Sequence, residues 1–280
     1  MGNCNTCPSG STCTKDKESC TVENNPLNNV KNVIGVMSGK GGVGKSSIST
    51  LIAKELSKKG YSVGILDADI TGPSIPRLLG VNKQRAVAID QGLLPITNKD
   101  GIKVMSLNLL TDNENDPVIW RGPMISGVVK QFWTDVIWGD LDYLLIDMPP
   151  GTGDVALTVM QSIPLNEIIM VSVPQDMVSM IVSKAVNMAR QMNIDILGVI
   201  ENMSYITCED CGKKIKLFNG DSTNKFLNEM NLNLLGELPM LSSISNLGQE
   251  NQNDKNVEEI LKPIIKSIIE KSQKNIKVEV

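Results

Sequence analysis

The chain has 280 residues, of which 41% are hydrophobic, so it is long enough to bury one large core. Its 27 basic and 31 acidic residues are dispersed and give a net charge of −4, so no basic stripe for nucleic acid is present. The first residues lack the apolar stretch of a signal peptide, and no run reaches about 18 apolar residues. We therefore expect a cytoplasmic protein that binds neither nucleic acid nor a membrane.

The beginning of the chain is polar and rich in cysteine. Four of the six cysteines, Cys4, Cys7, Cys13 and Cys20, lie in the first 20 residues, and an Asn-rich stretch follows. We interpret residues 1–31 as a flexible appendage and linker. In a reducing compartment such cysteines are thiols or metal ligands. Because histidine is absent, any soft-metal site with several ligands must be mostly thiolate.

From residue 32 onward, short apolar runs alternate with longer helical patterns, which is typical of βαβ units on a parallel sheet. Strands are expected at residues 33–38, 62–66, 103–107, 143–147, 167–173, 196–201 and 234–238. Helices are expected at residues 45–59, 123–137, about 177–192 and about 255–271. The prediction is one α/β domain at residues 32–280, with a doubly wound, mostly parallel sheet flanked by helices.

The last predicted helix has an apolar stripe formed by Ile260, Leu261, Ile264, Ile265 and Ile268. Lysines flank it, so an amphipathic membrane anchor is one interpretation. We favour packing of the stripe onto the sheet, because the helix lacks an aromatic or strongly basic face.

A glycine-rich motif follows the first strand and opens the first helix. Its glycines allow backbone N–H groups to surround a phosphate at the helix N-terminus. Lys45 is placed to reach the β- and γ-phosphates of ATP, and the Ser46 hydroxyl to bind Mg²⁺. A merely flexible turn is the alternative, and the strand before and helix after disfavour it. The motif therefore predicts that residues 32–280 form a P-loop ATPase domain. The expected nucleotide contacts are Gly39, Lys40, Gly41, Gly42, Val43, Gly44, Lys45, Ser46 and Ser47.

A second lysine, Lys40, lies inside this loop. The loop therefore resembles the deviant Walker A subclass, which includes the MinD/ParA proteins and the nitrogenase iron protein. The resemblance implies that Lys40 reaches across a dimer interface and stabilises charge on the partner's nucleotide, as an arginine finger does. A lysine on a surface loop is the simpler alternative.

Acidic residues end two of the predicted strands, at the edge where doubly wound sheets bind ligands. The resemblance makes Asp69 the residue that orients or deprotonates the attacking water. It places Asp67 near the Mg²⁺ shell, and Asp147 as the Walker B residue that holds Mg²⁺ through water. Residues 148–154, with Gly151, would be switch II, which senses the γ-phosphate. The expected magnesium site comprises Ser46, Asp67, Asp69 and Asp147.

Asn202 follows the strand expected at residues 196–201. At this place the MinD/ParA superfamily reads the adenine edge with a side-chain amide, and the resemblance gives Asn202 that role. An asparagine at a strand end is also a common turn former.

Cys208 and Cys211 form a CxxC motif in a segment that we expect to be a loop. Two thiolates supply half of the ligands that tetrahedral zinc or a cubane cluster takes. A two-fold dimer would complete the set with a second copy of the pair. Alternatively, Cys4 and Cys7 complete a distant zinc ribbon, or the pair is a redox dithiol, which the neighbouring acidic residues disfavour.

The motifs at residues 39–46, 66–74, 147–154 and 201–204, together with the CxxC motif, resemble the Mrp/ApbC-type ATPases. The resemblance covers the chain from about residue 32 to its end. It implies a homodimeric iron–sulfur cluster carrier in which Cys208 and Cys211 of both protomers hold a [4Fe–4S] cluster. ATP would control cluster assembly or transfer, and the partners would be apo iron–sulfur proteins and cluster assembly factors.

The N-terminal cysteines match the family in part. The spacing of Cys4, Cys7 and Cys13 resembles the last three members of a four-cysteine motif in the eukaryotic cytosolic scaffold of this family. The first member has no counterpart here, and Cys20 is additional. A second cluster, a zinc knuckle and a set of mobile thiols all remain open.

Three rival functions share the ATPase fold. A nitrogenase-like reductase needs cysteines in the middle of the chain, and none lies between Cys20 and Cys208. A Min- or Par-type positioning ATPase needs no metal-binding pair. A zinc-binding, ATP-dependent adaptor remains open, because ligand spacing alone does not separate zinc from iron–sulfur.

Overall fold

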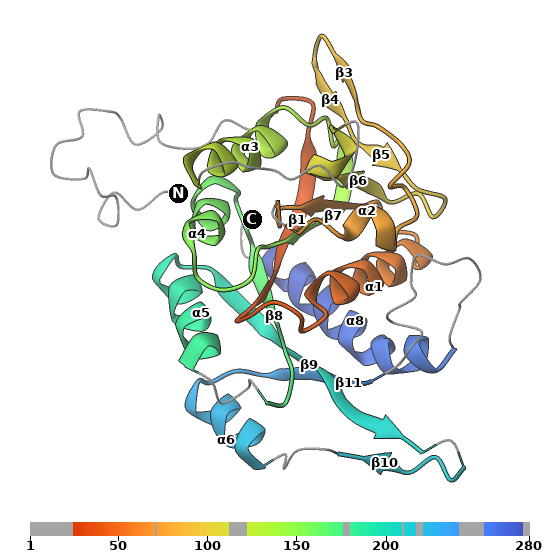
Figure 1. The fold of residues 1–280 in the computed structure, drawn as a ribbon, viewed down its shortest axis with the longest axis vertical. Coiled ribbons are helices and arrows are strands. Elements are labelled where there is room, and N and C mark those ends of the chain that lie inside the picture. Colours follow the sequence, from red (N-terminus) through yellow and green to blue (C-terminus); the bar gives the residue numbers. More distant parts are fainter. Residues whose placement is uncertain are drawn as a thin grey trace, which may run out of the picture.

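A computed structural model of the chain describes residues 25–70, 72–111, 122–175, 180–208, 210–216, 221–240 and 255–276. Within these ranges, helices cover both faces of one nine-stranded sheet (Figure 1). The strand order is β10-β9-β8-β1-β7-β2-β6-β5, and β11 also pairs with β9. Among the described strands of this sheet, only β10 and β5, each of two residues, run antiparallel to their neighbours. The predicted doubly wound, mostly parallel fold is confirmed.

The central strands are apolar and buried on both sides, as a doubly covered parallel sheet requires. They are β1 (Asn29–Ser38), β7 (Asp140–Asp147), β2 (Val63–Asp67) and β8 (Glu167–Ser172). The outer strands are β6 (Lys103–Met105), β5 (Ile96–Thr97), β9 (Asp195–Thr207), β10 (Lys214–Ile215) and β11 (Leu234–Pro239). A separate hairpin of β3 (Val87–Ile89) and β4 (Gly92–Leu94) projects from one end.

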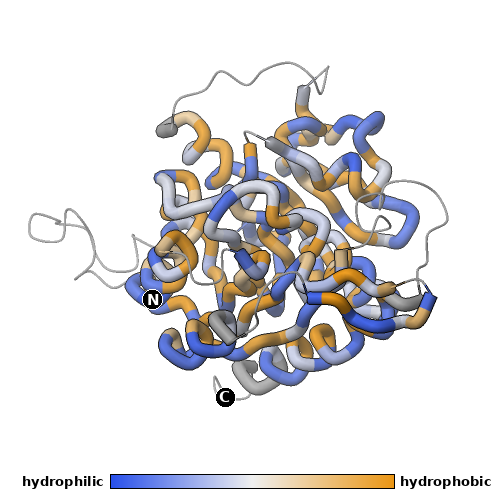
Figure 2. Tube along the Cα trace, turned by 60° about the horizontal axis from the view of Figure 1, so that its bottom comes forward, coloured by the Kyte–Doolittle hydropathy of each residue, from blue (hydrophilic) through white to orange (hydrophobic). Residues whose placement is uncertain are grey.

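Two apolar clusters lie on opposite faces of the sheet. One joins α1 (Lys45–Lys58), α2 (Ile75–Leu78) and α8 (Lys255–Ile276) to the sheet. The other joins α3 (Gly122–Thr134), α4 (Asp154–Ser162), α5 (Met180–Gln191) and α6 (Asp221–Glu229). Figure 2 shows apolar segments concentrated in the middle of the molecule and hydrophilic segments at its periphery.

The apolar stripe of α8 packs into the protein. Leu261, Ile264, Ile265 and Ile268 are buried in the same cluster as the apolar face of α1, and Ile260 packs against it. This confirms packing onto the sheet over an exposed anchor. Among the described residues, no helix is both long enough and apolar enough to span a bilayer.

Several predicted boundaries were wrong for identifiable reasons. The helix predicted at residues 123–137 ends at Thr134, because Asp135 and Ile137 exchange backbone hydrogen bonds with Leu93 of β4 instead. The strand predicted at 103–107 ends at Met105, and a 3₁₀ turn follows at Leu107–Leu109. The start of the helix predicted at about 177–192 falls partly outside the described residues.

The largest difference concerns β9. The strand predicted at residues 196–201 begins at Asp195 and continues to Thr207. Asn202 therefore lies inside a strand, and Cys208 follows it directly. The extension depends on pairing with β11, which follows α6 in the chain, and with the two residues of β10 just beyond the cysteine turn. Neither pairing leaves a periodic signal within β9 itself.

The chain is anchored before β1 begins. Asn25 donates a side-chain hydrogen bond to the Thr134 carbonyl at 3.0 Å, and Asn28 donates one to the Val136 carbonyl at 2.9 Å. These bonds fix residues 25–28 to the end of α3, ahead of the domain boundary expected at residue 32. Cys4, Cys7, Cys13 and Cys20 lie outside the described residues.

Candidate nucleotide site and cysteine pair

The glycine-rich loop joins the carboxyl end of β1 to the start of α1, where doubly wound sheets bind ligands. Gly42 and Gly44 have φ angles of 83° and 82°, in the left-handed region that favours glycine. A Cβ on Gly44 would lie 2.4 Å from Asn202 Nδ2, whereas a Cβ on Gly42 would meet nothing within 4 Å. The loop is therefore packed tightly at Gly44 and open at Gly42, where a phosphate would approach.

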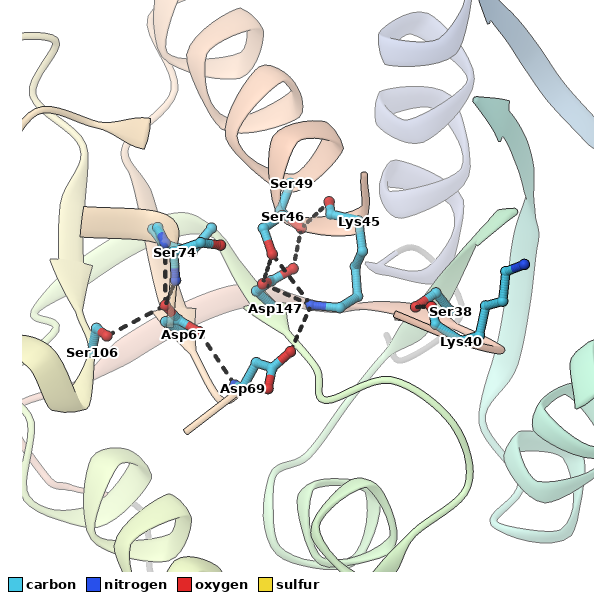
Figure 3. A network of polar contacts seen from close by, with 11 residues as sticks. Ser38, Lys40, Lys45, Ser46, Ser49, Asp67, Asp69, Ser74, Ser106 and Asp147 are labelled. Atoms are coloured by element: carbon cyan, nitrogen blue, oxygen red, sulfur yellow. Dashed lines mark hydrogen bonds and ion pairs between the residues drawn. The ribbon is translucent and has the colours of Figure 1, made fainter. Parts of the chain in front are cut away.

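Asp147 is the centre of the polar network beside this loop (Figure 3). Lys45 Nζ lies 2.8 Å from its Oδ2, and the Ser46 hydroxyl donates to the same oxygen at 2.6 Å. The Ser49 hydroxyl donates to Oδ1 at 2.7 Å. Asp147 is fully buried, so these donors compensate the loss of water around its carboxylate.

Ser49 is a site residue that the sequence reasoning missed. It lies four residues after Lys45, on the same face of α1, and is fully buried. A polar residue on a buried helix face needs a hydrogen-bond partner, and that rule was the available signal. The partner, Asp147, is the last residue of strand β7.

Asp69 faces the same lysine, since its Oδ2 lies 3.9 Å from Lys45 Nζ. Its side chain is 16% exposed, so solvent reaches part of it. Ser46, Asp69 and Asp147 thus lie around Lys45 (Figure 3), and the magnesium site expected at Ser46, Asp67, Asp69 and Asp147 stays a prediction.

Asp67 is turned towards its own loop. Its carboxylate accepts backbone N–H groups of Asp69 at 3.2 Å, Ser74 at 3.1 Å and Ile75 at 3.2 Å, and the Ser106 hydroxyl at 3.3 Å. Complete burial, followed by the neighbouring Asp147 charge, raises the pKa of Asp67 to about 8, while Lys45 and the Ile75 N–H oppose the rise. In this structure Asp67 therefore orders the loop that carries Asp69.

The switch II segment is hydrogen-bonded to the end of β1. The Met148 N–H donates to the Val36 carbonyl at 3.0 Å, and the Gly151 N–H donates to the Ser38 carbonyl at 2.8 Å. A Cβ on Gly151 would lie 3.6 Å from the Gly39 carbonyl oxygen, and its φ is 80°. Switch II thus lies directly beside the glycine-rich loop.

Lys40 differs from Lys45 in its direction. Its side chain is exposed and extends away from Lys45 and Asp147 (Figure 3). Its carbonyl accepts the Ser38 hydroxyl at 2.9 Å, which fixes the backbone of the loop. Within one chain, Lys40 is therefore not part of the cluster around Asp147.

Asn202 contacts the loop from β9. Its Nδ2 donates to the Val43 carbonyl at 2.9 Å, and the residue is 1% exposed. Its Oδ1 is buried and has no hydrogen-bond partner among the described residues. A buried acceptor without a donor is costly, so the site favours a ligand that donates a hydrogen bond there.

Cys208 and Cys211 lie on a tight turn between β9 and β10. The Cys208 N–H donates to the Lys213 carbonyl at 3.0 Å, and the Gly212 N–H to the Cys208 carbonyl at 2.9 Å. Gly212 has a φ of 69°, which suits glycine. Both thiols are free; Cys208 is partly exposed and Cys211 exposed.

The turn favours the thiolate form of Cys208. The backbone N–H of Cys211, then that of Asp210 and the Cys211 thiol, donate hydrogen bonds that lower the pKa of Cys208. The net shift in the pKa of Cys208 is therefore downward, and it arises from these hydrogen bonds. The two largest contributions come from backbone N–H groups, which the turn itself places beside the sulfur.

The described part of the chain offers no complete metal site. It contains no group of three or more Cys, Asp or Glu side chains that could hold a metal ion. The pair at Cys208 and Cys211 thus needs further ligands from another chain or from residues outside the described ranges, where Cys4 and Cys7 lie.

The sequence model of the family described as "ParA: NUBPL iron-transfer P-loop NTPase" matches residues 29–273. An iron-sulfur cluster carrier protein of Clostridium perfringens is 52% identical over 254 residues, which cover 86% of this chain and 89% of that protein. A protein of the same name from Methanocaldococcus jannaschii is 42% identical over 285 residues, which cover 96% of each chain.

Solved structures share the fold. A nucleotide-binding protein of Archaeoglobus fulgidus, in complex with ADP and with Co found by PIXE, is 42% identical, with a TM-score of 0.70. The match covers 78% of this chain and 86% of that one. The septum site-determining protein MinD of Pyrococcus horikoshii, complexed with Mg-ADP, has a TM-score of 0.60 at 18% identity and covers 86% of this chain and 96% of that one. At that identity the likeness concerns the fold alone.

Proposed function

The chain belongs to the NUBPL iron-transfer P-loop NTPase family, as its motifs predicted, and on this premise we propose that it is an ATP-hydrolysing carrier of [4Fe–4S] clusters. The observation that carries the proposal is the turn at Cys208 and Cys211. It presents two accessible thiols, one of them favoured as thiolate, and supplies only half of a cluster's ligands. Relatives that are 52% and 42% identical are named iron-sulfur cluster carrier proteins.

The carrier acts as a homodimer. A two-fold axis near the cysteine turn brings a second copy of Cys208 and Cys211 within reach, which completes four thiolates for one cluster. Such a cluster is shared between chains and lies near the surface, so it can be passed to an apo-protein acceptor. Cluster assembly factors would supply it.

The nucleotide site fits ATP with Mg²⁺. The open space at Gly42 suits phosphates. The buried, unpartnered Oδ1 of Asn202 suits the amino group of adenine. The oxygens of Ser46 and Asp147 suit a hard cation. Mg²⁺ would neutralise phosphate charge when bound. Ser46 and Asp147 would hold it, Asp147 through water, and Asp69 would complete its surroundings.

Lys45 changes partners when the triphosphate arrives. In this structure it is ion-paired with Asp147 at 2.8 Å and is 6% exposed. The β- and γ-phosphates attract the same ammonium group, which frees Asp147 for its metal role. Asp69 then orients the attacking water, and Lys40 of the partner subunit stabilises the charge that develops on the phosphate.

Switch II reports the nucleotide state. The Gly151 N–H is bonded to the Ser38 carbonyl in this structure, and Gly151 lies beside the Gly39 carbonyl of the glycine-rich loop. A γ-phosphate oxygen is a stronger acceptor than a carbonyl, so it draws this N–H away. Residues 148–154 then rearrange in the ATP state and return after hydrolysis.

Anaerobic reconstitution with iron and sulfide tests the proposal. The intact chain should bind about four irons per dimer, and a Cys208→Ala/Cys211→Ala variant should bind none at this site while it still binds ATP. A chain with Cys4→Ala, Cys7→Ala, Cys13→Ala and Cys20→Ala is the control, and it should keep the shared cluster. Iron that remains in the first variant and disappears in the control would move the site to the N-terminus.

The zinc-binding adaptor is the second candidate, because two thiolates on a tight turn also suit tetrahedral zinc. The same samples distinguish it. Tightly held zinc, without iron, sulfide or visible absorption after reconstitution, would support the adaptor and refute the cluster carrier.

A further inference from the structure

Strand β9 is irregular between the nucleotide site and the cysteine pair. Its pairing with β11 advances from Glu201 to Tyr205, while β11 advances only from Glu237 to Pro239. Residues 202–204 of β9 therefore face a single residue of β11. Such a bulge bends the strand and re-aims side chains, and bulges are frequent beside active sites.

The middle residue of the bulge, Met203, has a φ of 54°. The other described non-glycine residues with positive φ are Asn193 and Asn231, and asparagine tolerates this region. Methionine has no such tolerance, and strain of this kind persists where the surroundings impose it. The Met203 side chain reaches the glycine-rich loop, since its Cε lies 4.0 Å from where a Cβ on Gly44 would be.

Side-chain hydrogen bonds fix the strand on both sides of the strained position. Asn202 Nδ2 holds the Val43 carbonyl of the glycine-rich loop at 2.9 Å. On the other side, the Ser204 hydroxyl donates to Glu201 Oε2 at 2.5 Å, and the Thr223 hydroxyl of α6 donates to Oε1 at 3.0 Å. Glu201 is 3% exposed, so this carboxylate is a buried anchor for the bulge.

The bulge also marks the place where β9 leaves the main sheet. Pairing with β8 ends at Glu201, and pairing with β11 ends at Tyr205. Beyond that, residues 206–207 pair only with β10, as a two-stranded ribbon that carries Cys208 (Figure 1). A ribbon held at one end turns when the backbone at its base rotates, so a small change at Met203 moves the thiols.

We infer that Met203 is a positioning residue whose left-handed backbone links Asn202 in the nucleotide site to the ribbon that carries Cys208 and Cys211. A nucleotide that donates a hydrogen bond to the unpartnered Oδ1 of Asn202 pulls on the bulge. Because hydrogen bonds hold Asn202 and Ser204 in place, a rotation of the backbone at Met203 is transmitted to the ribbon. The inference deepens the proposed function, on which it rests for the ligands at the two ends, by naming the connection between them.

The test measures thiol reactivity in metal-free protein. The full chain carries Cys4→Ser, Cys7→Ser, Cys13→Ser and Cys20→Ser, so that Cys208 and Cys211 are the only thiols. The rate of their reaction with DTNB is measured with and without Mg-ATP. The two rates should differ about fivefold or more, the lower end of typical coupling between sites.

Two variants at the hinge make the test specific. Met203→Gly adopts φ of either sign freely, so it absorbs the movement, and the two rates should become equal while a titration shows that Mg-ATP still saturates the site. Met203→Leu keeps a side chain and the strain, and should keep the rate difference. A rate difference that survives in Met203→Gly, that is lost equally in Met203→Leu, or that is absent from the parent chain overturns the inference.

This readout is independent of iron. If reconstitution shows that no cluster binds, the proposed function fails, yet the reactivity ratio still decides whether β9 couples the two sites. If the cluster binds as proposed and the ratio is one, only the inference about Met203 fails.

Discussion

Asp67 and Asp147 lie directly opposite each other in the register of β2 and β7, and both side chains are fully buried. Two carboxylates in this position repel one another, and burial penalises their charge further. Asp147 is compensated by Lys45, Ser46 and Ser49. Burial, followed by the charge of Asp147, raises the pKa of Asp67, whose partners are backbone N–H groups and one hydroxyl.

The raised pKa of Asp67, about 8, makes stability depend on pH. The unfolded value is about 3.9, so the folded chain holds an extra proton between these values. The resulting stabilisation is fully present below about pH 4 and is lost as the pH rises through about 8. Without nucleotide and Mg²⁺, the free energy of unfolding should fall by up to about 1.4 kcal/mol per pH unit between pH 6 and 8.

Urea unfolding of wild type and Asp67→Asn at pH 6, 7 and 8 checks this prediction. The variant cannot titrate at that position, so its stability should change less over the same range. Asp142→Asn is the matched control, because Lys31 lowers the pKa of Asp142 and keeps its titration below this window. Parallel curves for wild type and Asp67→Asn would contradict the raised pKa.

Ser49→Ala removes the hydroxyl that donates to Asp147 Oδ1 at 2.7 Å. Loss of a donor to a buried carboxylate should cost about 1–3 kcal/mol of unfolding free energy. It should also lower the ATPase rate, because Asp147 is less firmly oriented. Ser57→Ala on the same helix removes an exposed bond to the Asp100 carbonyl and should cost less than about 0.5 kcal/mol. Equal losses in the two variants would show that Ser49 has no special role.

Gly44→Ala should abolish nucleotide binding. Its φ of 82° is strained for alanine, and the new Cβ would lie 2.4 Å from Asn202 Nδ2. Gly60→Ala separates the two effects, since Gly60 has a φ of 88° and nothing within 4 Å of its Cβ. That variant should lose about 1–2 kcal/mol of stability through strain and still bind ATP in a titration. Normal ATP affinity in Gly44→Ala would show that the contact with Asn202 is dispensable.

Mixed dimers test whether Lys40 acts on the partner's nucleotide. Lys40→Ala should bind ATP normally but hydrolyse it about a thousandfold more slowly, as expected for loss of a trans-acting cation. Lys45→Gln should be inactive, while its amide can still donate to Asp147 in place of the ammonium group. In an equimolar mixture, half of the dimers are mixed and each has one intact site, so roughly a quarter of the wild-type rate should return. A mixture as slow as its components would argue for action within one chain.

The parts of the site that are contiguous in sequence could be predicted from it. The glycine-rich loop follows strand β1, and Lys45 and Ser46 open helix α1 directly after it. The local sequence pattern specifies the strand, the loop and the helix. Asp67 and Asp147 ended apolar runs, and parallel topology brings the ends of neighbouring strands together. The CxxC motif needed only its spacing.

Features that depend on contacts between distant segments could not be predicted from the sequence. The direction of the Asp67 carboxylate is decided by the backbone N–H groups of Asp69, Ser74 and Ile75 and by the Ser106 hydroxyl. The hydrogen bond of Ser49 is decided by Asp147, which is 98 residues away. The passage of β9 through Asn202 depends on β11 and on a contact with Val43, which is 159 residues distant.

The sequence by itself therefore determined the fold class, the position of the nucleotide loop and the identity of the cysteine pair, because each rests on local spacing and hydrophobic period. Only the tertiary structure decided which oxygen each donor satisfies, that burial raises the pKa of Asp67 and where β9 is strained. Burial and hydrogen-bond satisfaction are properties of the assembled core, so no local pattern encodes them.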